Sequence, residues 1–137
     1  MSPSRGKRIR VLLAEDEPGI LYTFSAILRE QGYQVDTAQT YVGAQGQIQA
    51  HHYDALICDL NLERLGMGLE LAREAKELAF PPAVVIYTGY PTLEQLREAL
   101  ALRVDYLALK LVDLEEIKGA LHRLIARRAQ SLEPSSV

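Results

Sequence analysis

Acidic, hydroxyl and lysine side chains follow the predicted strands of this chain, at the points where the strands end. They are Glu15 and Asp16 after the first strand, Asp59 after the third, Thr88 after the fourth and Lys110 after the fifth. Three carboxylates within a few ångströms repel one another unless a cation lies between them, and hard oxygen ligands with free water positions suit Mg²⁺. One carboxylate could attack phosphorus and form an acyl phosphate. The cation, the lysine and the hydroxyl would then neutralise the charge of the transferred phosphoryl group.

The elements that must position these residues alternate along the chain. Apolar runs predict five strands, at 9–14, 34–38, 54–58, 83–87 and 106–109, and apolar residues at helical spacing predict a helix after each strand. The strands are apolar on both faces, which is typical of a parallel sheet covered by helices on both sides. We therefore expect a doubly wound α/β fold. Ligands of such folds bind beyond the carboxyl ends of the strands, where the polar residues stand.

Local signals indicate where several of these helices begin and end. Pro18 suits the first turn of the first helix, and Gly32 closes that helix. The second helix, expected over 41–52, contains two glycines that each cost about 1 kcal/mol relative to alanine. The third helix is expected to include Leu78 and to stop before two prolines. Asp113 is placed as the N-cap of the last helix.

Length and composition limit the classes of protein to which the chain can belong. Its 137 residues predict one domain, over 9–131, with a disordered leader at 1–8 and a disordered tail at 132–137. No apolar run approaches the about 20 residues of a membrane span, and the basic start lacks the apolar core of a secretory signal. The net charge of −3 argues against a nucleic-acid-binding surface. We expect a cytoplasmic protein that binds neither membranes nor nucleic acid.

Four segments, in order and at strand ends, together resemble the receiver domain of two-component response regulators. They are VLLAEDEP at 11–18, ICD at 57–59, VIYTGY at 85–90, and Lys110 followed by VDLEEI at 112–117. The resemblance covers about residues 9–128. It implies a flavodoxin-like fold, in which a five-stranded parallel sheet has the order 2-1-3-4-5 and helices cover both faces.

The resemblance also implies a role for each polar residue at the sheet edge. Asp59 would accept a phosphoryl group from a histidine kinase or a phosphotransfer protein. Glu15 and Asp16 would hold Mg²⁺ together with Asp59 and the backbone carbonyl of Asn61, and Lys110 would pair with a phosphoryl oxygen. Such a domain catalyses only its own Mg²⁺-dependent phosphorylation and dephosphorylation, so the resemblance implies no further enzyme activity.

Signalling is implied to pass from the phosphoryl group to a partner protein. Thr88 would hydrogen-bond the phosphoryl group and carry the switch, while Asn61 and Tyr90 occupy positions that tune the dephosphorylation rate. No residues are left for a DNA-binding output domain, so we expect output through contact with an unknown downstream protein. We expect a monomer, or a weak homodimer through the face formed by the fourth helix, the fifth strand and the fifth helix.

Several positions depart from the usual family pattern. Leu111 follows the lysine where a cis proline is usual, and a cis bond before leucine would cost about 2.5–4 kcal/mol, so that loop is either trans or differently shaped. Leu107 occupies the usual place of the switch aromatic. Tyr106 comes one residue earlier, which predicts that its side chain points to the other face of the sheet unless a bulge restores the register. Glu63 replaces a proline, and the run that begins at Gly68 comes one residue late. These departures bear on signal transmission more than on phosphoryl acceptance.

Each polar residue also has a purely structural interpretation. Glu15 and Asp16 would stabilise a helix N-terminus through its dipole by about 0.3–1 kcal/mol. Asp59 could cap the loop after its strand, and Lys110 could be a salt-bridge partner. The coincidence of all four at strand ends favours phosphoryl chemistry over these separate interpretations.

Three other functions stay open at this point. A receiver-like adaptor would bind partners without phosphorylation, and phosphoryl acceptance at Asp59 would separate it from a working receiver. A flavodoxin needs a Ser/Thr/Gly loop after the first strand to hold the phosphate of FMN, whereas this loop is acidic. A phosphatase of the haloacid dehalogenase type needs an aspartate two residues after its nucleophile, but Pro18 stands at that spacing from Asp16.

Overall fold

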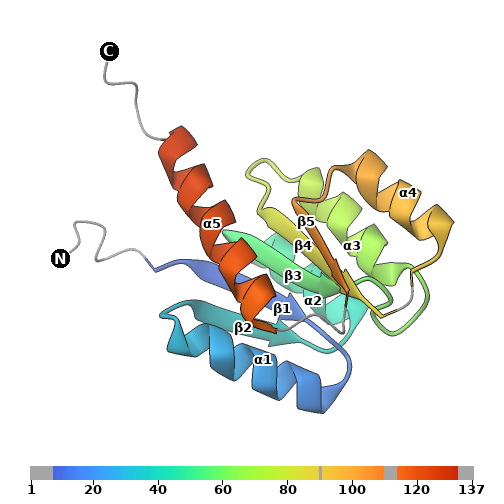
Figure 1. Cartoon of the computed structure of the whole chain (residues 1–137), viewed down its shortest axis with the longest axis horizontal. Helices are drawn as coiled ribbons and strands as arrows, with labels where there is room; N and C mark the ends of the chain where they lie inside the picture. Colours follow the sequence, from blue (N-terminus) through green and yellow to red (C-terminus); the bar gives the residue numbers. More distant parts are fainter. Residues whose placement is uncertain (1–7, 90, 110–113, 133–137) are drawn as a thin grey trace.

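The computed structural model describes residues 8–89, 91–109 and 114–132 (Figure 1). Most of the expected leader and tail, Tyr90, and the segment that contains Lys110, Leu111 and Asp113 lie outside the described residues. The disorder expected at both ends, the geometry of the loop at Leu111 and the N-cap at Asp113 therefore stay predictions.

Strands and helices alternate through the described part of the chain. The strands are β1 (Arg10–Ala14), β2 (Gln34–Ala38), β3 (Ala55–Asp59), β4 (Ala83–Thr88) and β5 (Tyr106–Leu109). The helices are α1 (Pro18–Glu30), α2 (Tyr41–Ala50), α3 (Met67–Lys76), α4 (Leu93–Leu102) and α5 (Leu114–Leu132). Every pairing between these strands is parallel, and the strand order is β2-β1-β3-β4-β5. The predicted doubly wound fold and its strand order are confirmed.

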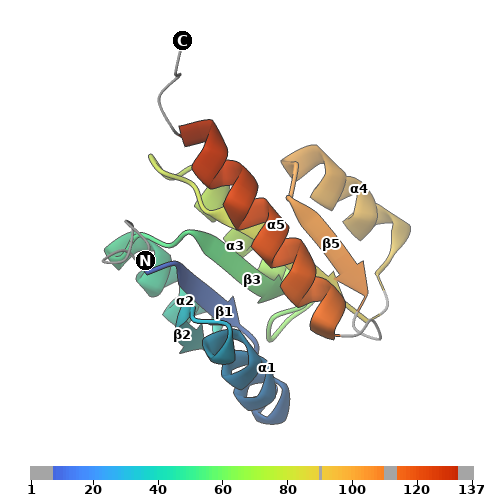
Figure 2. The same ribbon diagram turned by 60° about the vertical axis from the view of Figure 1, so that its left-hand side comes forward.

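Helices cover both faces of the sheet (Figures 1 and 2). One face packs against α1 and α5, and the other packs against α2, α3 and α4. Successive residues of β1 alternate between these two cores, with Val11 and Leu13 on the α1–α5 side and Leu12 and Ala14 on the other. Side chains on both faces of β3 and β4 are buried, whereas the edge strands β2 and β5 are partly exposed. Because both faces are covered, the central strands are apolar throughout instead of alternating.

The first helix begins and ends where its sequence predicts. Pro18 opens α1, and the Glu17 side chain caps it by accepting a hydrogen bond from the N–H of Ile20 at 2.8 Å. The helix ends at Glu30, and Gly32 follows with φ of 93°, in the left-handed region that glycine tolerates.

The next two helices are shorter than predicted. α2 ends at Ala50 because the chain becomes extended at His51 and brings Tyr53, 3% exposed, into the core. α3 ends at Lys76, so the prediction that it includes Leu78 is wrong. The Leu78 N–H donates to the carbonyl of Ala75, three residues back, and this tighter turn closes the helix.

Close contact between α3 and the end of β3 depends on Gly68. Its N–H donates to the Leu60 carbonyl at 2.8 Å. A Cβ atom added at this position would lie 2.0 Å from the Asp59 carbonyl oxygen and 2.7 Å from that of Leu60. Both obstacles are backbone atoms that cannot rotate away, so the first turn of α3 can approach β3 only through a glycine.

The close contact predicts a large loss of stability for Gly68→Ala. We expect the free energy of unfolding to fall by about 3 kcal/mol, at the upper end of ordinary overpacking. Gly46→Ala is the matched control, since nothing lies within 4 Å of a Cβ added there. It should stabilise α2 by about 1 kcal/mol. Urea unfolding followed by circular dichroism measures both, and equal small effects would contradict the proposed clash.

Candidate functional site

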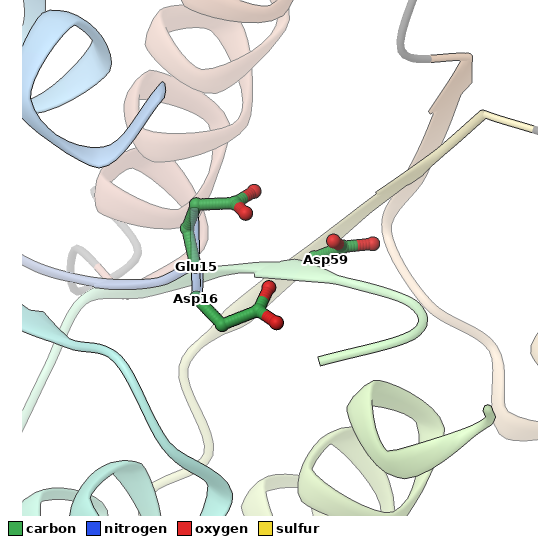
Figure 3. Close-up of side chains that lie close together, drawn as sticks. All are labelled: Glu15, Asp16 and Asp59. Carbon is green, nitrogen blue, oxygen red and sulfur yellow. The ribbon is translucent and has the colours of Figure 1, made fainter. Parts of the chain in front are cut away.

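Three carboxylates meet at the carboxyl edge of the sheet. β1 pairs with β3, with Ala14 in register with Cys58, so the residues that follow β1 lie beside Asp59. One carboxylate oxygen each from Glu15, Asp16 and Asp59 lies within 4.8 Å of the other two (Figure 3). Glu15 and Asp59 are buried and Asp16 is exposed. The structure thus brings together the three acidic residues selected from the sequence.

The chemistry of this donor set fits a divalent cation. Hard carboxylate oxygens and an exposed side, where water can complete the coordination shell, are what Mg²⁺ prefers. Two of the three carboxylates are buried, so their mutual repulsion is poorly screened by solvent. A cation at this position would relieve that repulsion, and Glu15, Asp16 and Asp59 are the residues that would hold it.

Glu15 accepts hydrogen bonds from Glu17 and Tyr87. Its side chain is 0% exposed. The N–H of Glu17 donates to Oε2 at 2.8 Å, and the phenol of Tyr87 donates to Oε1. Burial, followed by the charge of Glu15, raises the pKa of Tyr87 well above its usual range, so the phenol stays protonated and remains a donor. No role for Tyr87 was predicted from the sequence, although a tyrosine among the aliphatic residues of this strand was an available signal.

Asp59 is followed by a loop that hydrogen bonds hold in place. The Asn61 N–H donates to Oδ1 of Asp59 at 3.1 Å, and the Leu60 N–H donates to the Tyr87 carbonyl at 2.8 Å. The Asn61 side-chain oxygen accepts from the N–H of Gly66 at 2.8 Å and from Nε2 of Gln95 at 3.0 Å. The Asn61 side chain therefore joins this loop to α4. The expected role of its backbone carbonyl as a metal ligand stays a prediction.

The same loop is also joined to α2. Glu63, which replaces the usual proline, has φ of 62°, and its carboxylate accepts from the N–H of Tyr41 at 2.6 Å. Tyr41 is the first residue of α2, where a negative charge interacts favourably with the helix dipole. Neither Glu63 nor Gln95 was identified from the sequence as a contact of the site. The capping box formed by Thr92 and Gln95 was the one available signal for Gln95.

Thr88 ends β4 with a hydroxyl that has no partner among the described residues. The side chain is 0% exposed, and Oγ1 makes no hydrogen bond there. Its neighbour in register is Leu109, the residue before Lys110. Lys110 and Tyr90 lie outside the described residues, so their predicted roles are untested. A buried hydroxyl without a hydrogen-bond partner among the described residues could donate to an acceptor atom of a bound ligand at this edge.

Tyr106 lies on the opposite face of the sheet from the usual switch aromatic. The pairing of β4 with β5 runs without a bulge from Val85 opposite Tyr106 to Thr88 opposite Leu109. Tyr106 packs on the α1–α5 side, and its hydroxyl donates to Glu116 of α5 at 3.2 Å. Leu107 packs on the α2–α4 side. The predicted change of face is confirmed.

Comparison with known proteins places these features in a family. The family model for the response regulator receiver domain matches residues 11–122. The alginate biosynthesis transcriptional regulatory protein AlgB of Pseudomonas aeruginosa is 33% identical over 108 residues, which are 78% of this chain and 24% of that protein. The transcriptional regulatory protein ZraR of Klebsiella oxytoca is 26% identical over 130 residues, 94% of this chain and 29% of that protein. The chain thus spans less than a third of the length of either relative.

Solved structures show the same fold. A CheY-like response regulator receiver domain protein from Methanospirillum hungatei superposes with a TM-score of 0.85 at 23% identity, covering 91% of this chain and 99% of that one. A response regulator from Burkholderia pseudomallei, solved with a phosphorylated aspartic acid, a calcium ion and citrate, gives a TM-score of 0.74 at 22% identity. It covers 91% of this chain and 75% of that one. Among the described residues of the present chain, none of the helices is both long and apolar enough to cross a membrane.

The Thr88 hydroxyl has no partner among the described residues, which predicts that Thr88→Val stabilises the protein in the absence of phosphate. A buried polar group without a partner costs about 1–3 kcal/mol, so replacing it by a methyl group should raise the free energy of unfolding by about 1 kcal/mol. Thr37→Val in the half-buried strand β2 is the control and should change stability less. Urea unfolding checks both, and a clear loss of stability in Thr88→Val would mean that the hydroxyl has a partner.

The acidic cluster predicts opposite effects of Asp16→Asn with and without a cation. In EDTA the variant should unfold at the same temperature as the wild type or a higher one, because one of three repelling charges is gone. Mg²⁺ at 100 times its dissociation constant should add about 2.7 kcal/mol to the free energy of unfolding of the wild type and so raise its unfolding temperature. It should raise the unfolding temperature of the variant less. Glu98→Gln, which removes an exposed charge on α4, should respond as the wild type does. Equal responses in all three would contradict a cation site.

Proposed function

The chain belongs to the response regulator receiver domain family, and from that premise we propose that Asp59 accepts a phosphoryl group from a histidine kinase or a phosphotransfer protein. The observation that carries the proposal is the position of Asp59. Its carboxylate is 5% exposed, lies with those of Glu15 and Asp16, and stands at the edge of the sheet where ligands of doubly wound folds bind.

The proposed transfer reaction takes place at the acidic cluster. Glu15, Asp16, Asp59 and the Asn61 carbonyl would hold Mg²⁺, which would supply positive charge against the phosphoryl oxygens. A carboxylate oxygen of Asp59 attacks the phosphorus and a P–O bond forms. The bond from phosphorus to the donor's nitrogen or oxygen breaks, and its electron pair leaves with the donor. The Asn61 N–H, 3.1 Å from Oδ1, fixes the plane of the Asp59 carboxylate before the attack.

Thr88 and Lys110 complete the proposed phosphoryl site. The Thr88 hydroxyl, buried and without a partner among the described residues, donates to one phosphoryl oxygen. Lys110 pairs with another. Hydrolysis of the acyl phosphate restores Asp59, at a rate that Asn61 and Tyr90 tune. We propose no enzyme activity beyond this self-phosphorylation and self-dephosphorylation.

Output is proposed to pass through protein contact at the face formed by α4, β5 and α5. Leu93 and Leu100 of α4 and Leu109 of β5 are 66%, 77% and 49% exposed. Exposed apolar side chains of this size on two of the three elements favour a partner surface there. Movement of Thr88 and of the loop after it toward the phosphoryl group would change this face for a downstream protein or a second copy of the chain. We also propose a cytoplasmic location, where the proposed phosphodonors would act.

An adaptor that binds partners without phosphorylation is the second candidate. The position of Tyr106 favours it, because this aromatic contacts Glu116 of α5 and lies on the face of the sheet away from the usual switch position. Phosphoryl acceptance separates the two functions.

Intact mass spectrometry after incubation with acetyl phosphate and Mg²⁺ tests the proposed function. The wild type should gain the mass of one phosphoryl group, labile to base, and the gain should disappear when EDTA replaces Mg²⁺. Asp59→Asn should gain nothing, whereas Asp54→Asn, five residues earlier in the chain, should behave as the wild type does. An adduct on Asp59→Asn would identify a different acceptor. The absence of an adduct from a wild type that binds Mg²⁺, under quenching fast enough to trap a short-lived one, would favour the adaptor.

A further inference from the structure

Tyr87 contacts both acidic segments of the site. It is in register with Asp59 across the β3–β4 pair, and its carbonyl accepts from the N–H of Leu60, the residue after Asp59. Its hydroxyl donates to Oε1 of Glu15. We propose that Tyr87 is a positioning residue that orients the Glu15 carboxylate so that the acidic cluster binds Mg²⁺. This inference rests on the metal site of the proposed function and goes beyond it in assigning a role outside the acidic residues.

The ring of Tyr87 is itself fixed by packing. Tyr87 is 2% exposed and lies in the core between the sheet and the α1–α5 layer. Phe24 of α1 packs edge-on against it, with ring centroids 6.0 Å apart and planes inclined at 61°. A phenol on a rigid ring in a central strand delivers its hydrogen bond to one place only.

The two donors to Glu15 approach different oxygens. Tyr87 donates to Oε1, and the N–H of Glu17 donates to Oε2 at 2.8 Å. The carboxylate cannot rotate without breaking one of these bonds, and because it is 0% exposed, water cannot replace a lost donor.

Orientation of Glu15 matters because the other two acidic residues are placed by different means. Asp16 is exposed, and Asp59 is held through Oδ1 by the Asn61 N–H. Groups that orient metal ligands through hydrogen bonds are typically worth 10–100-fold in metal affinity. The phenol of Tyr87 is a side-chain donor, whereas the donor of Glu17 is a backbone N–H, so substitution of Tyr87 can remove its hydrogen bond without altering the backbone.

Tyr53 provides an internal comparison for a purely structural phenol. It is 3% exposed, and its hydroxyl donates to Oδ2 of Asp36 at 2.6 Å. Burial is the largest cause of the raised pKa of Tyr53, as it is for Tyr87. Tyr53 precedes β3, whereas Asp59 ends it, so the two residues lie at opposite ends of that strand. Loss of either hydroxyl removes one buried bond to a carboxylate, but only one of these bonds belongs to the metal site.

Calorimetric titration of Mg²⁺ into the wild type, Tyr87→Phe and Tyr53→Phe tests the role. The dissociation constant should rise about 10-fold or more in Tyr87→Phe and stay at the wild-type value in Tyr53→Phe. Both variants should lose comparable stability in EDTA. The ultraviolet difference spectrum on adding Mg²⁺ gives a second readout, since a band from a perturbed tyrosine should be present in the wild type and Tyr53→Phe and absent from Tyr87→Phe.

Several outcomes would overturn the proposal. They are an Mg²⁺ affinity of Tyr87→Phe within about twofold of the wild type, equal weakening in Tyr53→Phe, or a wild type that binds no Mg²⁺. If Tyr87→Phe does not fold, the tyrosine ring resonances of the wild type decide, because Mg²⁺ should shift those of Tyr87 and leave those of Tyr53 in place. Acetyl phosphate labelling reports separately on the proposed function. A wild type that binds Mg²⁺ through a Tyr87-dependent site without accepting a phosphoryl group would contradict the proposed function but support the role of Tyr87.

Discussion

The site depends on the burial of two carboxylates side by side, Glu15 at the end of β1 and Asp59 at the end of β3. Parallel pairing of these central strands forces the two charges together, and the helices on both faces exclude most of the water that would screen them. Hydrogen bonds from Glu17, Tyr87 and Asn61 partly compensate for the lost hydration. Two carboxylates that are this close together, with little water to screen them, would bind a cation more favourably than exposed acidic residues do. The packing of the core is thereby linked to the chemistry at its edge.

The loop after Asp59 connects this edge to two helices. Glu63 accepts from the first N–H of α2, and the Asn61 side chain accepts from Gln95 in the first turn of α4. Gly68 lets α3 begin directly against the backbone of β3. A shift of the loop by a fraction of an ångström must therefore strain a hydrogen bond at the N-terminus of α2 or of α4. The departures of the sequence from the usual family pattern at 63 and 68 thus fall on residues that anchor this loop.

The sequence predicted the features that depend on local pattern. Apolar runs and turn residues predicted the strands and helices, and the resemblance to receiver domains implied the strand order. The side-chain period of two along a strand predicted that Tyr106 lies on the opposite face from the usual aromatic. The bonds of Tyr87 to Glu15 and of Gln95 to Asn61 were not predictable in this way. They join residues 72 and 34 positions apart, and only the finished fold brings such side chains within reach. The ends of α2 and α3 were placed wrongly because burial of Tyr53 and a tight closing turn outweighed helical periodicity.

The position of Tyr106 limits the routes by which a change at the proposed phosphoryl site could reach the proposed partner face. Thr88 and Tyr106 are three register positions apart on opposite faces of the sheet, so rotation of this aromatic cannot fill space that a moving threonine leaves. α4 is closer to the site, because its first turn holds Gln95, whose side chain already contacts the loop after Asp59. The capping box between Thr92 and Gln95 makes the Gln95 side chain part of the N-terminus of α4. Displacement of Asn61 would therefore act directly on the N-terminus of this helix. The exposed leucines at 93 and 100 lie on the same helix. In this chain the proposed connection from the acidic edge to the partner face would therefore run along α4, whereas the phenol of Tyr106 contacts Glu116 of α5.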